Sequence, residues 1–310
     1  MTRFMIKRLG FMLATMAVVS LLLFALLEIS PGSVATKVLG PYTSAEQRNL
    51  WLEANGYFRP FHVRYLSWLG DMLRGDFGAS TRFKVPVGEV LWPRLGNTAV
   101  LAGMVLVVMV PLSLTLGMLA GMKEGSLLDR VISLVSVVTT SVPEFANAVI
   151  LAALFVFLLG WLPGTSAMAD GFSLREMVLP VLVLVLYDFG YVTRMTRASM
   201  VEVMTRAYIR TAVLKGLPYR RVIVRHALRN ALIAPFTVVM LQINWLLSGV
   251  IVVEFFFAYK GFGSLLLEAS LNQDLFLIEA CTMVSVAVAV ATQTLADVGY
   301  VYLNPRIRFA

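Results

Sequence analysis

Long apolar runs alternate with short charged segments along the chain, and this alternation is the main signal in the sequence. Six runs are long enough to cross a membrane as a helix of about 20 residues, and they cover Leu9–Leu27, Thr98–Met122, Val131–Trp161, Met177–Val192, Ala231–Ala258 and Leu275–Leu303. Within each run the apolar residues are continuous rather than alternating with polar ones, which argues against a membrane β-barrel. The pattern predicts an all-α integral membrane protein with six transmembrane helices.

The six runs divide the chain into three parts. Residues 1–29 hold a basic tail and the first span. This span is longer than the about 7–15 apolar residues of a secretory signal and precedes a poor cleavage site, so we expect it to stay uncleaved. Residues 30–96 form a segment outside the membrane, and residues 97–310 form a core of five spans with a cytoplasmic loop at 194–234.

The segment outside the membrane contains one amphipathic pattern, at residues 65–78. Leu66, Leu69, Met72 and Leu73 fall on one face of a helix there, with Trp68 nearby. Such a helix lies either in the membrane surface or against the protein's own bundle, and the pattern fits both interpretations.

Composition supports the membrane assignment and argues against several kinds of site. Charged residues make up 14% of the 310 residues, against about 25% in a soluble domain, and the mean hydropathy is +0.81. The single cysteine, Cys281, cannot form a disulfide within the chain, and His62 and His226 do not have the spacing of metal ligands. The sequence shows no nucleophile–base pair, so we expect a protein that is not an enzyme and binds no metal.

Lysine and arginine set the expected orientation of the spans. With the N-terminus in the cytoplasm, the cytoplasmic segments 1–8, 123–130, 194–229 and 304–310 carry sixteen of the 26 basic residues. Eight of the others lie in the long outer segment, where the positive-inside bias counts little. We therefore expect both termini in the cytoplasm, and the net charge of +8 follows from this bias without any nucleic-acid partner.

Glycines and prolines within the spans predict how the helices pack. Gly117 and Gly121 in "GMLAG" lie about one turn apart, which predicts the close approach of another helix. Prolines within or at the ends of spans predict kinks, with or without a role in transport, and they are Pro111, Pro143, Pro180 and Pro235.

The densest basic segment runs from Arg194 to Arg229, with nine Lys/Arg and one acid, Glu202. No Pro or Gly interrupts it before Gly216, so we expect the fourth span to continue as a helix to Lys215.

A corner and a second helix are predicted after that point. Gly216 suits a helix end with positive φ, and Pro218 suits the first turn of a new helix that reaches about Leu232. One stripe of the second helix is predicted to be basic, and it consists of Arg221, Arg225 and Arg229. The corner would therefore join two helices that are each continuous with a span.

Several functions fit a basic corner. It could set the orientation of the chain, contact acidic lipid head groups, bind nucleic acid or face a partner protein. Tyr208 and Tyr219 are its only aromatic residues, too few for a nucleic-acid stacking platform. An orienting loop needs no ordered corner, which favours a partner that moves the two spans.

The corner also carries a resemblance to a known family. The stretch "MTRASMVEVMTRAYIRTAVLKGLPYRRVIVRHALRNALIAP" resembles the cytoplasmic loop of ABC importer permeases, and more narrowly that of the dipeptide, oligopeptide and nickel class. The blocks "YLSWLGDMLRGDFGAS", "VVEFFFAYKGFGSLLLEA" and "NPRIRF" resemble the same class, and the long outer segment resembles its B-type subunit. Departures from the usual residues occur at Glu28, Ser33, Asp188, Lys260 and Gln273.

The resemblance implies a type I ABC importer permease fold in a bacterial or archaeal cytoplasmic (inner) membrane. The implied partners are a homologous C-type permease, one or two ABC ATPase subunits, an extracytoplasmic substrate-binding protein and membrane lipids. The chain lacks a phosphate-binding loop, so ATP and Mg would bind to the ATPase subunits and no cofactor to this chain. The implied ATPase-coupling residues are Glu202, Arg206, Tyr208, Arg210, Thr211, Ala212, Lys215 and Gly216.

The resemblance implies peptides as cargo, although the same class carries nickel complexes, glutathione, opines and oligosaccharides. A secondary transporter and a membrane scaffold remain as alternatives, and both would work without coupling ATP to transport. Asp188, inside the fourth span, is the candidate for a path or substrate contact. A carboxylate there costs about 2.5–3.5 kcal/mol and should face a cavity, a cation of the cargo, a basic group of the partner permease or the head groups.

Overall fold

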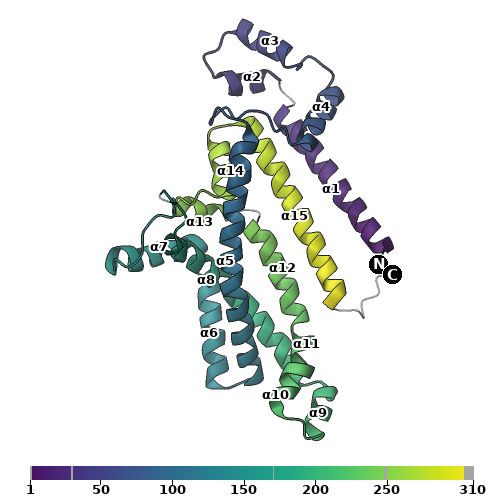
Figure 1. Cartoon of the computed structure of the whole chain (residues 1–310), viewed down its shortest axis with the longest axis vertical. Coiled ribbons are helices and arrows are strands. Elements are labelled where there is room, and N and C mark those ends of the chain that lie inside the picture. Colours follow the sequence, from purple (N-terminus) through teal and green to yellow (C-terminus); the bar gives the residue numbers. More distant parts are fainter. Residues whose placement is uncertain (1, 29–30, 170, 248–249, 304–310) are drawn as a thin grey trace. The chain divides into compact units, whose positions relative to one another are not determined.

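The structure, a computed structural model, describes residues 2–28, 31–169, 171–247 and 250–303, and it is helical without strands in those ranges (Figure 1). Four helices are long and apolar enough to cross a membrane, and two further pairs qualify when each bent pair is counted as one span. The described residues therefore contain four candidate spans, or up to six if each bent pair is one span. The chain divides into two compact units.

The first unit comprises residues 1–98 and 261–291. Its helices are α1 (Thr2–Glu28), α2 (Pro31–Leu39), α3 (Ala45–Ala54), α4 (Phe61–Arg74), the start of α5 (Val87–Met122), α14 (Phe262–Leu271) and the first part of α15 (Leu275–Leu303). Apolar side chains of α5, α14 and α15 form the core of this unit, among them Val87, Leu91, Phe262, Leu277 and the single cysteine, Cys281.

Helix α4 packs on its own unit through aromatic and polar contacts. The ring of Phe24 in α1 lies against the rings of Tyr65 and Trp68, with centroids 5.6 and 5.3 Å away. The Tyr65 hydroxyl hydrogen-bonds to the Ser20 hydroxyl (2.8 Å), and the Trp68 indole N–H donates to the buried Glu279 carboxylate of α15 (2.9 Å). These contacts come from Tyr65 and Trp68, whereas Leu66 and Leu73 of the predicted apolar face are 63% and 79% exposed, so a position of that face in the membrane surface stays a prediction.

The second unit comprises residues 99–260 and 292–310. Its helices are the rest of α5, α6 (Leu127–Ser141), α7 (Glu144–Ala152), the π-helix η1 (Ala153–Leu158), α8 (Leu174–Met204), α9 (Ala207–Leu214), α10 (Tyr219–Arg221), the π-helix η2 (Val222–Ala227), α11 (Leu228–Ala231), α12 (Ile233–Leu247), α13 (Ile251–Phe256) and the end of α15. Helix α8 is the most buried of the four long apolar helices, and it packs against α6, α7, α11 and α12. The core of this unit therefore centres on α8.

Glycines of α5 allow it to pack closely against α8. A Cβ on Gly117 would lie 2.5 Å from Thr196 Cβ and 2.6 Å from the Thr193 carbonyl oxygen. A Cβ on Gly121 would lie 2.7 Å from Met200 Cβ. The close approach predicted from "GMLAG" is confirmed, and α8 is the helix that makes it.

The third and fifth predicted spans are interrupted in the structure, and the kink expected at Pro143 is present. Residues 131–161 contain α6 and the α7–η1 helix, which are bent from each other by 99°. Pro143 precedes α7, and proline lacks a backbone donor and disfavours a helical residue before it, which explains why α6 ends at Ser141. Residues 231–258 contain α12 and the separate α13, and α12 is bent by 51° from the helix before it.

The helix of the fourth span ends at Met204, whereas the sequence predicted a helix to Lys215. Arg206 is extended, with φ −70° and ψ 143°, and α9 begins directly after it. This break lets Ile209 and Ala212 of α9 fold back into a buried apolar cluster. Burial of those side chains overrides the helical propensity of the segment, which is a weak signal by comparison.

The other spans follow the prediction. Helices α1 and α15 cover the predicted first and sixth spans, and α15 has the predicted bounds. Helix α5 covers the second span but begins earlier, at Val87. Apolar runs without a turn inside them therefore predicted their helices correctly.

Candidate functional site

The loop between α8 and α12 folds into a compact corner with an apolar core of its own (Figure 1). The buried members of this core come from α8, α9, η2 and α11, and they are Met200, Val203, Ile209, Ala212, Val222, Ile223, Ala227 and Ala231. The Ser199 hydroxyl of α8 also donates to the Ala231 carbonyl of α11 (2.8 Å). Helix α9 packs against η2, and the Asn230 side chain of α11 donates to the Tyr208 hydroxyl of α9 (3.1 Å).

The turn after α9 requires glycine. Gly216 has a φ of +74°, a conformation that L-residues rarely adopt. Its N–H donates to the Val213 carbonyl (2.9 Å), and the Leu217 N–H donates to the Ala212 carbonyl (3.4 Å), which is the Schellman arrangement. Pro218 then precedes α10. The predicted corner at Gly216 and Pro218 is confirmed.

Seven of the eight predicted coupling residues are exposed, namely Glu202, Arg206, Tyr208, Arg210, Thr211, Lys215 and Gly216. Glu202 and Arg206 form an ion pair with each other, and the Tyr208 hydroxyl accepts a hydrogen bond from Asn230 Nδ2 (3.1 Å). Ala212 differs, since it is only 6% exposed and packs into the corner's core. Its small size therefore serves the fold of the corner, and a direct contact with a partner stays a prediction.

Exposed apolar side chains at the end of α9 were missed by the sequence interpretation. Leu214 is 79% exposed and Val213 is 51% exposed, and both lie next to the Gly216 turn. Tyr219, the first residue of α10, is 51% exposed. Apolar groups that gather on an exposed surface mark sites of protein contact. The signal was present in "TAVLKGLP", where two aliphatic residues directly precede the corner.

The predicted arginine stripe lies on a leg that is only partly α-helical. Arg221, Arg225 and Arg229 are all exposed, but the stripe assumed the spacing of an α-helix. Residues Val222–Ala227 form a π-helix, in which hydrogen bonds join residues five apart and each turn is wider. That the three side chains share one face of the leg stays a prediction.

A buried ion pair fixes α6 to α8. Arg197 of α8 makes two hydrogen bonds to the Asp129 carboxylate of α6, from Nε to Oδ1 and from Nη2 to Oδ2 (2.7 Å for the second). The Gly125 N–H (2.9 Å) and the Ser133 hydroxyl (3.3 Å) donate to the same carboxylate. The Asp129 side chain is 4% exposed and that of Arg197 is 29% exposed. The sequence interpretation did not single out this pair, whose members are far apart in the chain.

A polar hollow of about 500 Å³ opens beside Asp188, the predicted path residue. Side chains of α6, α8 and α12 line it, namely Thr140, Ser141, Tyr187, Asp188, Tyr191, Arg194, Gln242 and Trp245. Asp188 is 1% exposed, and its Oδ1 accepts a hydrogen bond from Gln242 Nε2 (2.8 Å). Its Oδ2 has no hydrogen-bond partner among the residues that the structure describes. The carboxylate thus borders a cavity, and its role in a path stays a prediction.

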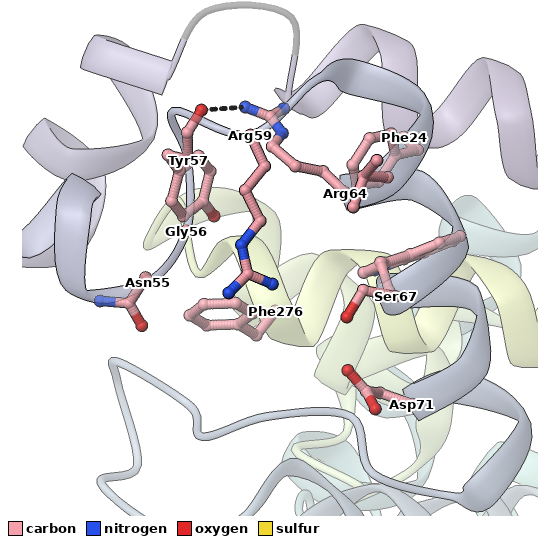
Figure 2. A pocket seen from close by; sticks show the side chains of 11 residues that line it. Phe24, Asn55, Gly56, Tyr57, Arg59, Arg64, Ser67, Asp71 and Phe276 are labelled. Carbon is pink, nitrogen blue, oxygen red and sulfur yellow. Dashed lines mark hydrogen bonds between the residues drawn. The ribbon is translucent and has the colours of Figure 1, made fainter.

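A second hollow, of about 200 Å³, lies in the first unit beside the turn between α3 and α4. Figure 2 shows Arg59 extending over the ring of Phe276, with Asp71 on the facing wall. Arg64 holds the turn, because its Nη1 donates to the Tyr57 carbonyl (3.3 Å) and its guanidinium lies 4.9 Å from the centre of the Tyr57 ring. Arg59 is exposed and Asp71 is half-exposed, so this hollow presents an open surface of mixed charge.

Some sequence features lie outside the part of the chain that the structure describes. They are the side chains of Glu28 and Ser33 and the C-terminal block "NPRIRF". Among the described residues, no group of three or more His, Cys, Asp or Glu side chains is placed to hold a metal ion.

Known proteins resemble this chain along its length. Residues 113–309, which include the corner and the Asp188 hollow, match the family described as binding-protein-dependent transport system inner membrane component. The chain is 32% identical to the oligopeptide transport system permease protein AppB of Bacillus subtilis (strain 168), with 100% of each chain covered. It is 31% identical to the probable peptide ABC transporter permease protein y4tP of Sinorhizobium fredii and 30% identical to the dipeptide transport system permease protein DppB of Escherichia coli (strain K12), with 99% of each chain covered in both cases. The chain therefore belongs to the family of binding-protein-dependent transport system inner membrane components, as a permease subunit of an ABC importer.

Proposed function

We propose that this chain is the B-type permease subunit of an ATP-driven importer that carries peptides across the cytoplasmic (inner) membrane of a bacterium or archaeon. The observation that carries the proposal is the full-length likeness to relatives named for oligopeptide and dipeptide transport. The chain forms the translocation path together with a homologous C-type permease, and each contributes a type I importer bundle.

The proposed topology has six spans with both termini in the cytoplasm. The concentration of basic residues in segments 1–8, 123–130, 194–229 and 304–310 supports this orientation. The long segment 30–96 then faces outward, where a substrate-binding protein delivers the cargo. The corner around α9 faces the cytoplasm.

The corner is the proposed contact for the ATPase subunits. The exposed Leu214 and Val213 at the tip of α9 offer an apolar surface, and Arg210 and Lys215 offer charges around it. ATP and Mg bind to the ATPase subunits, of which there are one or two kinds, rather than to this chain. When ATP draws the ATPase subunits together, α9 moves with them, and the corner's apolar core passes the movement to α8 and α11. ATP thereby favours one of two packings of the same spans.

Transport by the purified assembly tests the function. The chain is purified with its second permease and ATPase subunits and placed in proteoliposomes that enclose Mg-ATP, with the binding protein outside. We expect uptake of labelled trialanine that stops when either ATP or the binding protein is left out.

Two other outcomes would change the proposal. Uptake driven by an ion gradient without ATP would make the chain a secondary transporter. ATP-dependent uptake of a nickel complex, glutathione, an opine or an oligosaccharide, without any uptake of peptide, would keep the importer and replace the cargo.

A further inference from the structure

The hollow beside Asp188 has ends of opposite charge. At one end the Asp188 carboxylate is buried, with Oδ2 unpartnered among the described residues. At the other end the Arg194 guanidinium donates to the Gly190 carbonyl (3.3 Å) and to the Thr140 hydroxyl (3.4 Å). Both of these acceptors are neutral, and among the described residues no carboxylate pairs with Arg194, which is exposed.

The separation of the two charges suits a short peptide. Asp188 and Arg194 are six residues apart on α8, which places their Cα atoms about 9 Å apart along the helix axis. An extended chain covers about 3.3–3.6 Å per residue, so the charged ends of a peptide of two or three residues are separated by a similar distance. The hollow volume of about 500 Å³ leaves room for a ligand of this size.

The walls between the two ends are aromatic and polar. The rings of Tyr187 and Trp245 lie 5.5 Å apart, centroid to centroid, and Tyr191 and Gln242 complete the lining. Aromatic faces of this kind attract an ammonium group and pack against peptide planes without selecting a particular side chain.

Lipid cannot satisfy this surface. Asp188 and Gln242 belong to helices that are candidates for crossing the membrane, and their polar groups would be very costly against hydrocarbon, whereas Arg194 is exposed at the start of the basic segment 194–229. An ionised Asp188 without a cation costs free energy that a bound ammonium group would recover. A ligand with a positive group at one end and a negative group at the other therefore matches the two charged ends of the hollow.

We propose that this hollow binds a short peptide with free ends, its ammonium group on Asp188 and its carboxylate on Arg194. The proposal rests on the proposed peptide import and adds how the permease itself recognises the cargo. Asp188 is closed over in the present conformation, since only 1% of it is exposed. Gln242, whose amide occupies Oδ1, is the side chain that exchanges places with the incoming ammonium group.

Binding to the assembled importer can be measured without transport. Trp245 lines the hollow and reports occupancy through its fluorescence, and the Trp245→Phe complex supplies the background. The probes are trialanine, its N-acetyl form and its C-terminal amide. We expect each blocked form to bind the wild-type complex about tenfold more weakly than trialanine, because each loses one charge-assisted contact.

Pairing each probe with a variant assigns each end to one residue. In Asp188→Asn, N-acetylation should cost no further affinity, while amidation still costs about tenfold; in Arg194→Gln the pattern should reverse. If N-acetylation costs the same in Asp188→Asn as in the wild type, the proposal is overturned.

Two further outcomes separate the hollow from the transport function. Loss of the second permease from purified Asp188→Asn would assign the carboxylate to a contact between subunits and overturn the proposal. Peptide uptake without any Trp245-dependent signal would also overturn it, although the importer would stand. Conversely, the expected pattern of binding without ATP-dependent uptake would support the hollow and overturn the proposed function alone.

Discussion

At the scale of single residues, two ion pairs of the same chemistry lie in contrasting surroundings. Asp129 and Arg197 join α6 to α8 with Asp129 almost fully buried, whereas Glu202 and Arg206 lie one turn apart with both side chains more than half exposed. Solvent screens the exposed pair, and salt weakens it further. The buried pair is held by two further hydrogen bonds, so loss of one partner leaves the other without compensation.

Asp129→Asn should therefore destabilise the protein by about 3 kcal/mol, the low end for a buried pair because Arg197 retains some access to solvent. The fall in melting temperature of the purified protein in detergent measures this effect. Glu202→Gln is the matched control and should change the melting temperature much less. Equal losses for the two variants would show that the pair between α6 and α8 is not a stabilising contact.

At the scale of elements, the corner presents Leu214 outward while it keeps Ala212 inside. The two residues are separated by one position along α9, yet they have opposite roles, because residues two apart point to nearly opposite faces of a helix, one toward its own core and one toward its surroundings. A partner that grips this corner meets the leucine and the charges around it.

Leu214→Glu should abolish ATP-dependent uptake and retention of the ATPase subunits during purification, because a charge would be buried in the apolar part of the contact. Val224→Glu is the control, since Val224 is also an exposed aliphatic residue (58%) but lies on the other leg. Expression and melting temperature of both variants should match the wild type. Full ATPase retention by Leu214→Glu, with normal uptake, would place the contact elsewhere.

The sequence predicted the elements better than their directions. Apolar length located all six runs, and Gly216 with Pro218 located the corner, because those signals are local. The 99° bend at the end of α6 depends on Pro143 and on the packing of α7 against α8. The apolar content of a segment does not predict the direction of its helix. No glycine or proline directly precedes Arg206 to predict the break between α8 and α9, and the burial of Ile209 and Ala212 explains this break.

The candidate sites were predictable to different degrees for the same reason. Asp188 was evident from the sequence because a carboxylate inside an apolar run is conspicuous. Arg194 lies only six residues further along the same helix, whereas the Gln242 amide joins Asp188 only in three dimensions, since Gln242 is 54 residues away in the chain. The outward position of Leu214 could not be predicted while the segment was expected to be one continuous helix.

At the scale of the whole molecule, the proposed orientation gives a labelling test. Cys281 is buried, so it gives little background with a membrane-impermeant maleimide. Tyr42, which is fully exposed in the outer segment, and Glu124, exposed between α5 and α6, are suitable positions for single cysteines. Tyr42→Cys should react in intact cells, and Glu124→Cys should react only after the membrane is opened. Reaction of Glu124→Cys in intact cells would reverse the orientation.

The turn at Gly216 restricts the backbone conformation of the residue rather than the size of its side chain. No atom lies within 4 Å of the position that a Cβ would take there, so any small side chain fits. An L-residue must nevertheless adopt the mirror image of its preferred backbone, at about 1–2 kcal/mol, whereas a D-residue adopts it readily. D-alanine and L-alanine at this position contain the same atoms and leave the same surface for a partner. The corner would nevertheless be relaxed with D-alanine and strained with L-alanine.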